Sequence, residues 1–155
     1  MEEWRVIPKC ELYEVSTLGR VRRVGYPEIL VLLSQGKYLY FNPSINGIVK
    51  NMYVHRAVAL AFLPNIFAKP LVDHRNNNKT DNRVVNLRWA THQENALNRR
   101  GCSKSGLPKG VSLKKNGRYR AMFREKHLGI YDTPEEAHAA YCAAAEAYSP
   151  EFWRD

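Results

Sequence analysis

The chain has 155 residues, 45% of them hydrophobic, which excludes a disordered chain and suits one ordinary domain or a few very small ones. The formal net charge is +9, and ten of the 24 Lys and Arg residues lie between residues 99 and 126 with one acidic residue among them. A solvated surface normally mixes both signs, so this basic stripe indicates a binder of polyanions.

The sequence has no recognisable signal for secretion, for insertion into a membrane or for a disulfide framework. The chain does not start with a charged segment followed by an apolar one, and its apolar runs are too short to cross a bilayer. The three cysteines are widely spaced without a C-x-x-C pair, so we expect reduced thiols in the cytoplasm, with neither a zinc site nor a disulfide framework. These cysteines are Cys10, Cys102 and Cys142.

Short β-forming runs separated by turn residues fill residues 1–50 and predict an antiparallel β module. Asn46-Gly47 lies between two such runs and is a strong hairpin signal, because both residues tolerate positive φ. A strand over residues 20–24 would place Arg20 and Arg22 on one face. That face meets either phosphates or solvent, and the sequence favours neither.

Helical spacing of apolar residues predicts a helix over residues 54–62, in whose first turn His55 reads as a core or capping histidine. A short buried strand then runs into Asp73 and His74, and a polar, Asn-rich loop follows. Residues 86–90 predict a second strand.

The capping box from Thr91 to Glu94 predicts a helix that starts near His92. Asn95 then lies just over one turn into that helix. The expected order is strand, loop, strand, helix.

Residues 101–109 have the Gly, Ser and Pro content of a linker, and three short strands are expected after them, over residues 110–113, 118–124 and 126–131. Alternation puts three arginines on one face of the middle strand and apolar residues on the other. A capping box with Pro134 at the first helical position predicts a helix to about Tyr148. Its expected inner face comprises Ala137, Ala140, Tyr141, Ala144 and Tyr148. The basic side chains expected to reach a major groove are Lys114, Lys115, Arg118, Arg120 and Arg124.

Asp73, His74 and Asn95 supply the groups that hydrolysis of a phosphodiester requires. Neutral histidine is a suitable base, and a carboxylate with an amide carbonyl suits a hard cation such as Mg²⁺. A single carboxylate indicates one metal ion. A regular strand would point Asp73 and His74 to opposite faces, so the strand must end or distort there. The alternative is a chance pair beside Asn residues that serve only the turn.

Three segments of the chain resemble the HNH nucleases of the His-Me finger (ββα-metal) class, in particular phage and intron-encoded homing endonucleases. They are Val54-His55-Arg56 and residues 72–82 and 86–95, so the resemblance covers about residues 49–98. It implies that His74 is the general base and that Asp73 and Asn95 hold the metal. It also implies that Asn86 bonds across the loop and orients the histidine. The family usually has Gly where Asn77 stands, and we expect the loop to survive, because Asn accepts positive φ at modest cost.

Both flanks resemble known modules. Trp4, Ile7 and residues 13–16 and 19–21 resemble the module that commonly precedes this nuclease. Residues 110–112, 119–121 and 127–141 resemble the ethylene-response-factor (APETALA-type) DNA-binding domain, although Tyr119 replaces its usual Trp. The implied domains are the module at 1–50, the nuclease core at 51–100, the linker at 101–109 and the DNA-binding domain at 110–155.

We therefore expect an α+β protein, in which a small ββα-metal core is flanked by an antiparallel β module and by a three-stranded sheet with a helix. The resemblance implies a metal-dependent endonuclease that cuts double-stranded DNA to 5′-phosphate and 3′-hydroxyl ends with one Mg²⁺, for which Mn²⁺ can substitute. The alternatives are a DNA-binding regulator with an inactive core and a non-specific nuclease. We expect a monomer, with a dimer as the alternative, and a phage-encoded protein in the bacterial cytoplasm.

Overall fold

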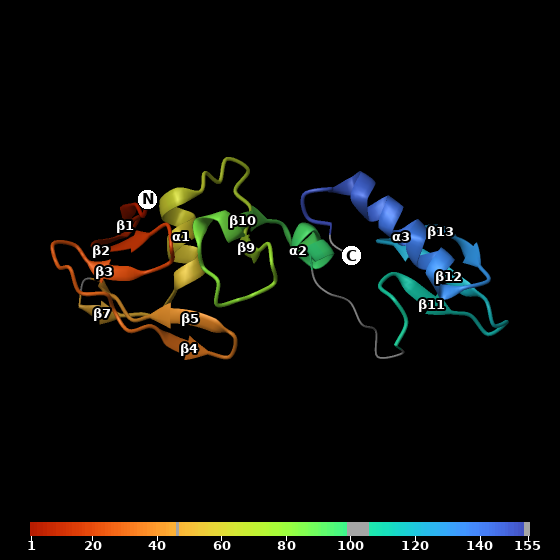
Figure 1. The fold of residues 1–155 in the computed structure, drawn as a ribbon, viewed down its shortest axis with the longest axis horizontal. Helices are drawn as coiled ribbons and strands as arrows, with labels where there is room; N and C mark the ends of the chain where they lie inside the picture. The colour runs from red at the N-terminus through yellow and green to blue at the C-terminus, as the bar shows by residue number, and fades with distance from the viewer. Residues whose placement is uncertain (46, 99–105, 154–155) are drawn as a thin grey trace. The chain divides into compact units, whose positions relative to one another are not determined.

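The computed structural model describes residues 1–45, 47–98 and 106–153. They form a mixed α/β fold of small antiparallel sheets and helices (Figure 1). The chain divides into two compact units, Met1–His92 and Gln93–Asp155. The boundary expected between residues 50 and 51 falls inside the first unit. No helix in the described ranges is long and apolar enough to span a membrane.

The first unit begins with two antiparallel three-stranded sheets, β1-β2-β3 and β4-β5-β8, and a ribbon, β6-β7. Ile45 pairs with Ile48, which confirms the hairpin expected there, although Asn46 lies outside the described residues. The strands are β1 Trp4–Ile7, β2 Cys10–Ser16, β3 Val21–Arg23, β4 Leu33–Gln35, β5 Tyr38–Phe41, β6 Ser44–Ile45, β7 Ile48–Val49 and β8 Met52–Tyr53.

Helix α1, Val54–Phe62, lies between the N-terminal strands and the strand pair that carries Asp73 and His74 (Figure 1). Its buried residues, among them Val54 and Val58, share one hydrophobic core with Ile7, Val15 and Leu87. Full burial of such a side chain contributes roughly 1.5–3 kcal/mol. Detaching the N-terminal strands would expose this shared core, so these strands and α1 stabilise each other.

Strand β9, Leu71–His74, pairs antiparallel with β10, Leu87–Ala90, and a loop with a short 3₁₀ turn, Val84–Asn86, connects them. Helix α2, His92–Asn98, follows, so the strand, loop, strand, helix order is confirmed. The helix begins at His92 as the capping box predicts, while the side-chain bonds of that box remain a prediction.

The second unit contains the sheet β11-β12-β13 and helix α3. The bounds are β11 Val111–Leu113, β12 Tyr119–Phe123, β13 Lys126–Tyr131 and α3 Pro134–Tyr148. The second capping box is confirmed, because Thr133 accepts from the amide of Glu136 and Glu136 accepts from that of Thr133. Gly110 has φ +78°, and a Cβ there would overlap the ring of Tyr141, so glycine lets the chain pass close to α3.

Two details of this unit differ from the prediction. Strand β12 ends at Phe123, and Arg124 occupies the turn before β13 with φ 57°, its guanidinium 4.8 Å from the Tyr148 ring centroid. The prediction that Arg124 lies on the strand is therefore wrong, because the turn uses two residues. On α3, Ala145 is fully buried in place of the expected Ala144, and Tyr148 is 44% exposed.

Candidate active site

Asp73 and His74 lie at the end of β9, with 1% and 0% of their surface exposed. The strand ends only after His74, and both residues pair in register with β10, so the distortion expected at this pair remains a prediction. Arg88 is directly opposite Asp73 on β10, where cross-strand side chains meet. Its Nε donates to Oδ2 of Asp73 at 2.9 Å, and its Nη2 is 2.8 Å from the same oxygen. The sequence analysis did not identify Arg88, because its place opposite Asp73 depends on the register in which β9 and β10 pair.

Asn82 holds the ring of His74. Nε2 of His74 is 3.1 Å from Oδ1 of Asn82, a residue only 4% exposed. If the amide oxygen accepts this bond, Nε2 carries the proton and Nδ1 has the lone pair that a base needs. Gly19, at φ +79°, approaches so closely that a Cβ would lie 2.9 Å from Cβ of Asn82. The turn at Gly19 therefore restricts the position of Asn82, and Asn82 in turn bonds the ring of His74.

The pKa of His74 is lowered from its ordinary value, with burial as the first cause. The hydrogen bond to Oδ1 of Asn82 opposes this effect, as do the charges of Asp73 and Asp81, whereas Lys79 reinforces it. Burial prevails, so the imidazole is neutral at physiological pH and able to accept a proton.

Asn86 bonds across the loop, as the resemblance implies. Its Oδ1 accepts from the amide of Asn76 at 3.0 Å, and its Nδ2 donates to the carbonyl of Asp81 at 2.7 Å. The side chain bonded to the His74 ring is that of Asn82, a residue the sequence analysis did not single out, and the role of Asn86 in orienting the histidine remains a prediction. Asn77, in the position of the family's Gly, has φ 61° and donates its amide to the His74 carbonyl at 2.9 Å, so the turn is kept.

A family model described as an HNH endonuclease matches residues 52–97, the segment that carries these contacts. The chain contains an HNH endonuclease domain. A second family model, the NUMOD4 motif, matches residues 2–41, the strands packed against α1. Both models end before the sheet of the second unit, so neither assigns that sheet to a family.

The HNH domain has viral and phage relatives. Two uncharacterised HNH endonucleases of Acanthamoeba polyphaga mimivirus are 39% and 31% identical over 101 and 94 residues, each match covering 61% of this chain but only 25% and 28% of the relative. DNA endonuclease I-HmuI of Bacillus phage SP01 is homologous, with 33% identity over 98 residues, which are 62% of this chain and 56% of that protein.

A solved structure of the HNH homing endonuclease I-HmuI matches this chain with a TM-score of 0.56 at 32% identity. That structure concerns DNA binding and cleavage by I-HmuI. The match covers 61% of this chain and 55% of that one. The chain spans about half the length of I-HmuI and about a quarter of the mimivirus relatives.

Asn95, the second metal ligand implied for the HNH domain, lies in α2 of the second unit. Asp73 belongs to the first unit, so their joint binding of a metal remains a prediction. Within the described ranges, no three His, Cys, Asp or Glu side chains gather where they could hold a metal ion. The expected ligand set of one carboxylate and one amide oxygen remains a prediction.

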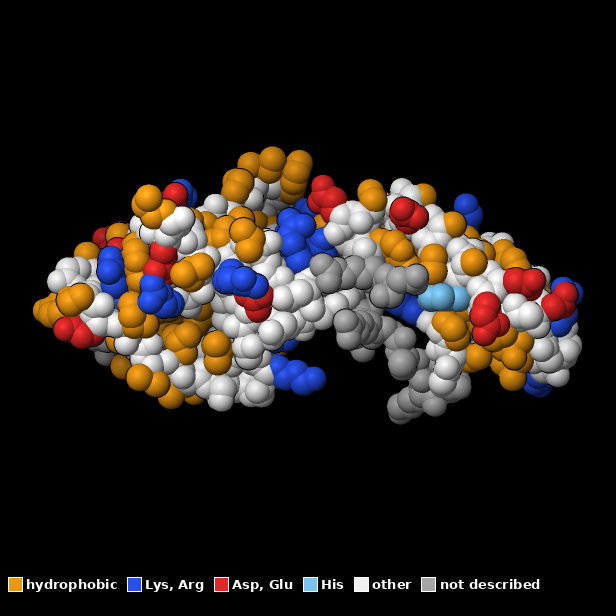
Figure 2. All heavy atoms as spheres, viewed as in Figure 1, with side chains coloured by type: hydrophobic (Ala, Val, Ile, Leu, Met, Phe, Trp, Pro, Cys, Tyr) orange, Lys and Arg blue, Asp and Glu red, His pale blue; other side chains and the backbone are white. Residues whose placement is uncertain are grey.

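Acidic neighbours compensate the charges of the two N-terminal candidates for DNA binding. Arg20 is paired with Glu2, and Arg22 with Glu14 at 2.6 Å. Figure 2 shows Lys and Arg side chains next to Asp and Glu on this unit. The role of both arginines in binding DNA remains a prediction.

The candidates of the second unit have different surroundings. Lys114, Lys115 and Arg120 line one shallow hollow beside β11. Arg120 donates to Oγ of Ser112 at 3.3 Å, and Arg118 is paired with Asp132 at 2.8 Å. Lys114 and Lys115 are both exposed.

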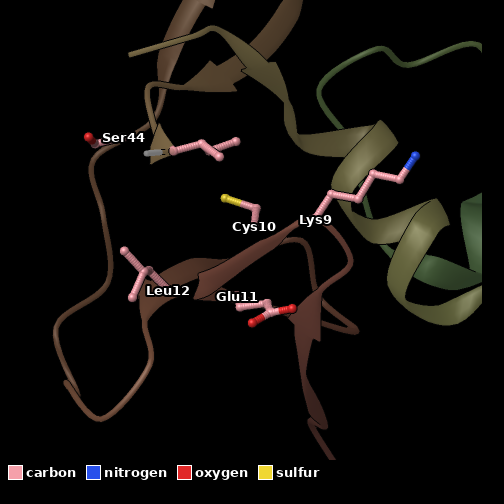
Figure 3. A pocket seen from close by; sticks show the side chains of 6 residues that line it. Lys9, Cys10, Glu11, Leu12 and Ser44 are labelled. Atoms are coloured by element: carbon pink, nitrogen blue, oxygen red, sulfur yellow. The ribbon is translucent and has the colours of Figure 1, made fainter. Parts of the chain in front are cut away.

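Cys10 points into a hollow beside the segment at Ser44 (Figure 3). The thiol is 3% exposed, and burial raises its pKa, which makes it a poor nucleophile. Cys10 is a free cysteine, whereas Cys102 lies outside the described residues. Cys10 therefore belongs to the hydrophobic core of the first unit.

Proposed function

We propose that this chain is a metal-dependent DNA endonuclease of the homing type, which hydrolyses phosphodiester bonds in double-stranded DNA. The observation that carries the proposal is the buried, neutral imidazole of His74, held through Nε2 by Asn82 next to the carboxylate of Asp73. I-HmuI and the two viral relatives are endonucleases by name, which supports the same activity.

In the proposed mechanism, Nδ1 of His74 removes a proton from the attacking water, while Asn82 keeps the other ring nitrogen protonated. Asp73 and Asn95 would hold one Mg²⁺, for which Mn²⁺ can substitute, and a bound ion would supply Lewis-acid stabilisation of the negative charge that develops during hydrolysis. Arg88 fixes the orientation of Asp73 through Oδ2. Asn86 keeps the loop closed. The products are a 5′-phosphate and a 3′-hydroxyl.

The second unit would supply much of the affinity for DNA. Strands β11, β12 and β13, followed by helix α3, have the element order of the ethylene-response-factor type of domain, to which we assign residues 110–155. We assign residues 1–50 to the nuclease-associated module, 51–100 to the ββα-metal core and 101–109 to the linker. The proposed DNA contacts are Arg20, Arg22, Lys114, Lys115, Arg118, Arg120 and Arg124.

We further propose a monomer with one active site that needs no zinc. One relative comes from a Bacillus phage, which supports a phage-encoded protein that acts in the bacterial cytoplasm. A regulator with an inactive core is the less favoured reading, because Asp73, His74 and Asn95 are all present. A non-specific nuclease would not need a further DNA-binding unit.

A nicking assay on supercoiled phage DNA tests the function. The wild-type chain should convert supercoiled to open-circular DNA in Mg²⁺ or Mn²⁺ but not in EDTA. The variant His74→Ala should bind the same DNA without nicking it. Wild-type-like nicking by His74→Ala in Mg²⁺ would refute the mechanism, and a map of cleavage sites would separate site-specific from non-specific cutting.

A further inference from the structure

Two aromatic rings from outside the β9–β10 pair contact His74. The ring centroid of His55, on α1, is 5.3 Å from that of His74, and the two planes are inclined by 61°. The ring centroid of Tyr38, on β5, is 6.2 Å from His74 and 5.1 Å from His55. The imidazole of His74 therefore packs against two rings that come from outside β9 and β10.

The strand pairing fixes the position of Tyr38. Strand β5 pairs with β8 through Tyr40 and Tyr53, and the Tyr53 hydroxyl donates to Gln35 of β4 at 3.3 Å. The ring of Tyr53 contacts Tyr38 at 5.8 Å and stacks on His55 at 5.5 Å. Tyr38 therefore reaches His74 from a sheet whose register holds it there.

His55 is a neutral member of this group. It is 7% exposed, and burial, followed by the charge of His74, lowers its pKa to about 3. Its Nδ1 is buried and lacks a hydrogen-bond partner among the described residues. A buried, unpaired polar atom lowers stability, and an apolar side chain would avoid that loss. His55 therefore places an uncharged ring next to His74.

We propose that Tyr38 and His55 are positioning residues that hold the imidazole of His74 in one orientation, so that strand β5 forms part of the nuclease site. Tyr38 lies in the segment that matches the NUMOD4 motif and precedes the segment that matches the HNH model. The inference rests on the proposed role of His74 as general base. Asn82 holds the edge of the ring, and the two aromatic neighbours restrict its rotation.

Nitrogen NMR of the full-length chain with ¹⁵N-labelled histidine tests the positioning without any DNA. Wild type should show His74 in a single tautomer, protonated at Nε2. Tyr38→Leu, which keeps an apolar side chain but removes the ring, should give averaged tautomers, and Tyr38→Phe should restore the single one. Tyr40→Leu is the matched control, because Tyr40 lies on the same strand and contacts Tyr53.

Single-turnover nicking of supercoiled phage DNA in Mg²⁺ tests the consequence. Tyr38→Leu and His55→Leu should lower the rate roughly tenfold to a hundredfold at unchanged DNA affinity, since a slightly misplaced base loses that much. Tyr38→Phe should recover most of the rate. Melting temperatures of all variants show which of them remain folded.

The outcomes separate the two proposals. If the wild type does not nick DNA, the proposed function fails, while the tautomer of His74 still decides the positioning. If Tyr38→Leu keeps a single tautomer, or loses rate and stability only as Tyr40→Leu does, the positioning proposal is overturned.

Discussion

Arg88 and Asp73 face each other across β9 and β10, and both Nε and Nη2 of the arginine approach a single carboxylate oxygen, at 2.9 and 2.8 Å. Both side chains are almost completely buried, with 8% and 1% of their surface exposed. Removing one partner of such a pair leaves a buried charge without compensation. The pair therefore couples the stability of the first unit to the orientation of the proposed metal ligand.

Arg88→Met should destabilise the chain by about 3–5 kcal/mol, because the carboxylate of Asp73 stays buried without its cation. Urea unfolding at neutral pH measures this. Arg83→Met is the matched control, because Arg83 pairs with Asp81 at 2.7 Å on the exposed side of the loop and should change stability little. Equal effects of the two variants would contradict the assignment of Arg88.

Asn82→Ala should lower the nicking rate roughly tenfold to a hundredfold at unchanged DNA affinity, because it removes the acceptor that sets the tautomer of His74. Asn78→Ala is the control from the same loop, since the Asn78 side chain accepts bonds from the nearby Thr80 and, among the described residues, has no bond to His74. Single-turnover rates on one DNA measure both. A rate for Asn82→Ala equal to that of Asn78→Ala would show that Asn82 does not act through His74.

Local signals in the sequence predict local structure well. Capping boxes and Asn-Gly turns involve residues within four positions of each other, so the start of α3 and the hairpin before Ile48 are correctly predicted. The turn at Arg124 is not, because the number of residues it uses depends on the pairing of Phe123 with Lys126.

The partners of the site depend on contacts that are distant in sequence. Several Asn side chains in the loop are chemically equivalent, and only the folded path of the loop brings Asn82 rather than Asn86 to His74. The contact of Tyr38 with His74 joins two different sheets. A pattern within one segment carries no information on either contact, whereas the pair Asp73 and His74 is recognisable from adjacent residues.

The stability of the first unit should fall as the pH drops below about 6.5. His55 has a pKa of about 3 in the folded chain and an ordinary value of 6.5 when unfolded, so the unfolded chain binds more protons in this window. The free energy of unfolding that depends on a neutral His55 is fully present above pH 6.5 and is lost progressively towards pH 3. The loss amounts to at most about 5 kcal/mol. Urea unfolding at pH 8, 6 and 4 measures the loss.

The variant His55→Leu should lose less stability than wild type over this pH range, because it has no group at that position to protonate. His92→Gln serves as the control, since His92 is exposed. An identical pH dependence of wild type and His55→Leu would contradict the buried, neutral state of His55.

Binding to DNA should depend on salt through the exposed lysines of the second unit. Each phosphate contact contributes roughly 0.9 to the slope of log K against log salt concentration. Lys114→Ala and Lys115→Ala should therefore each lower the slope by about that amount, because both side chains are exposed at the hollow beside β11. Arg20→Ala should change the slope less, because Glu2 already compensates its charge. Fluorescence anisotropy at several salt concentrations measures the slopes, and a larger effect of Arg20→Ala would place the main phosphate contacts on the N-terminal strands instead.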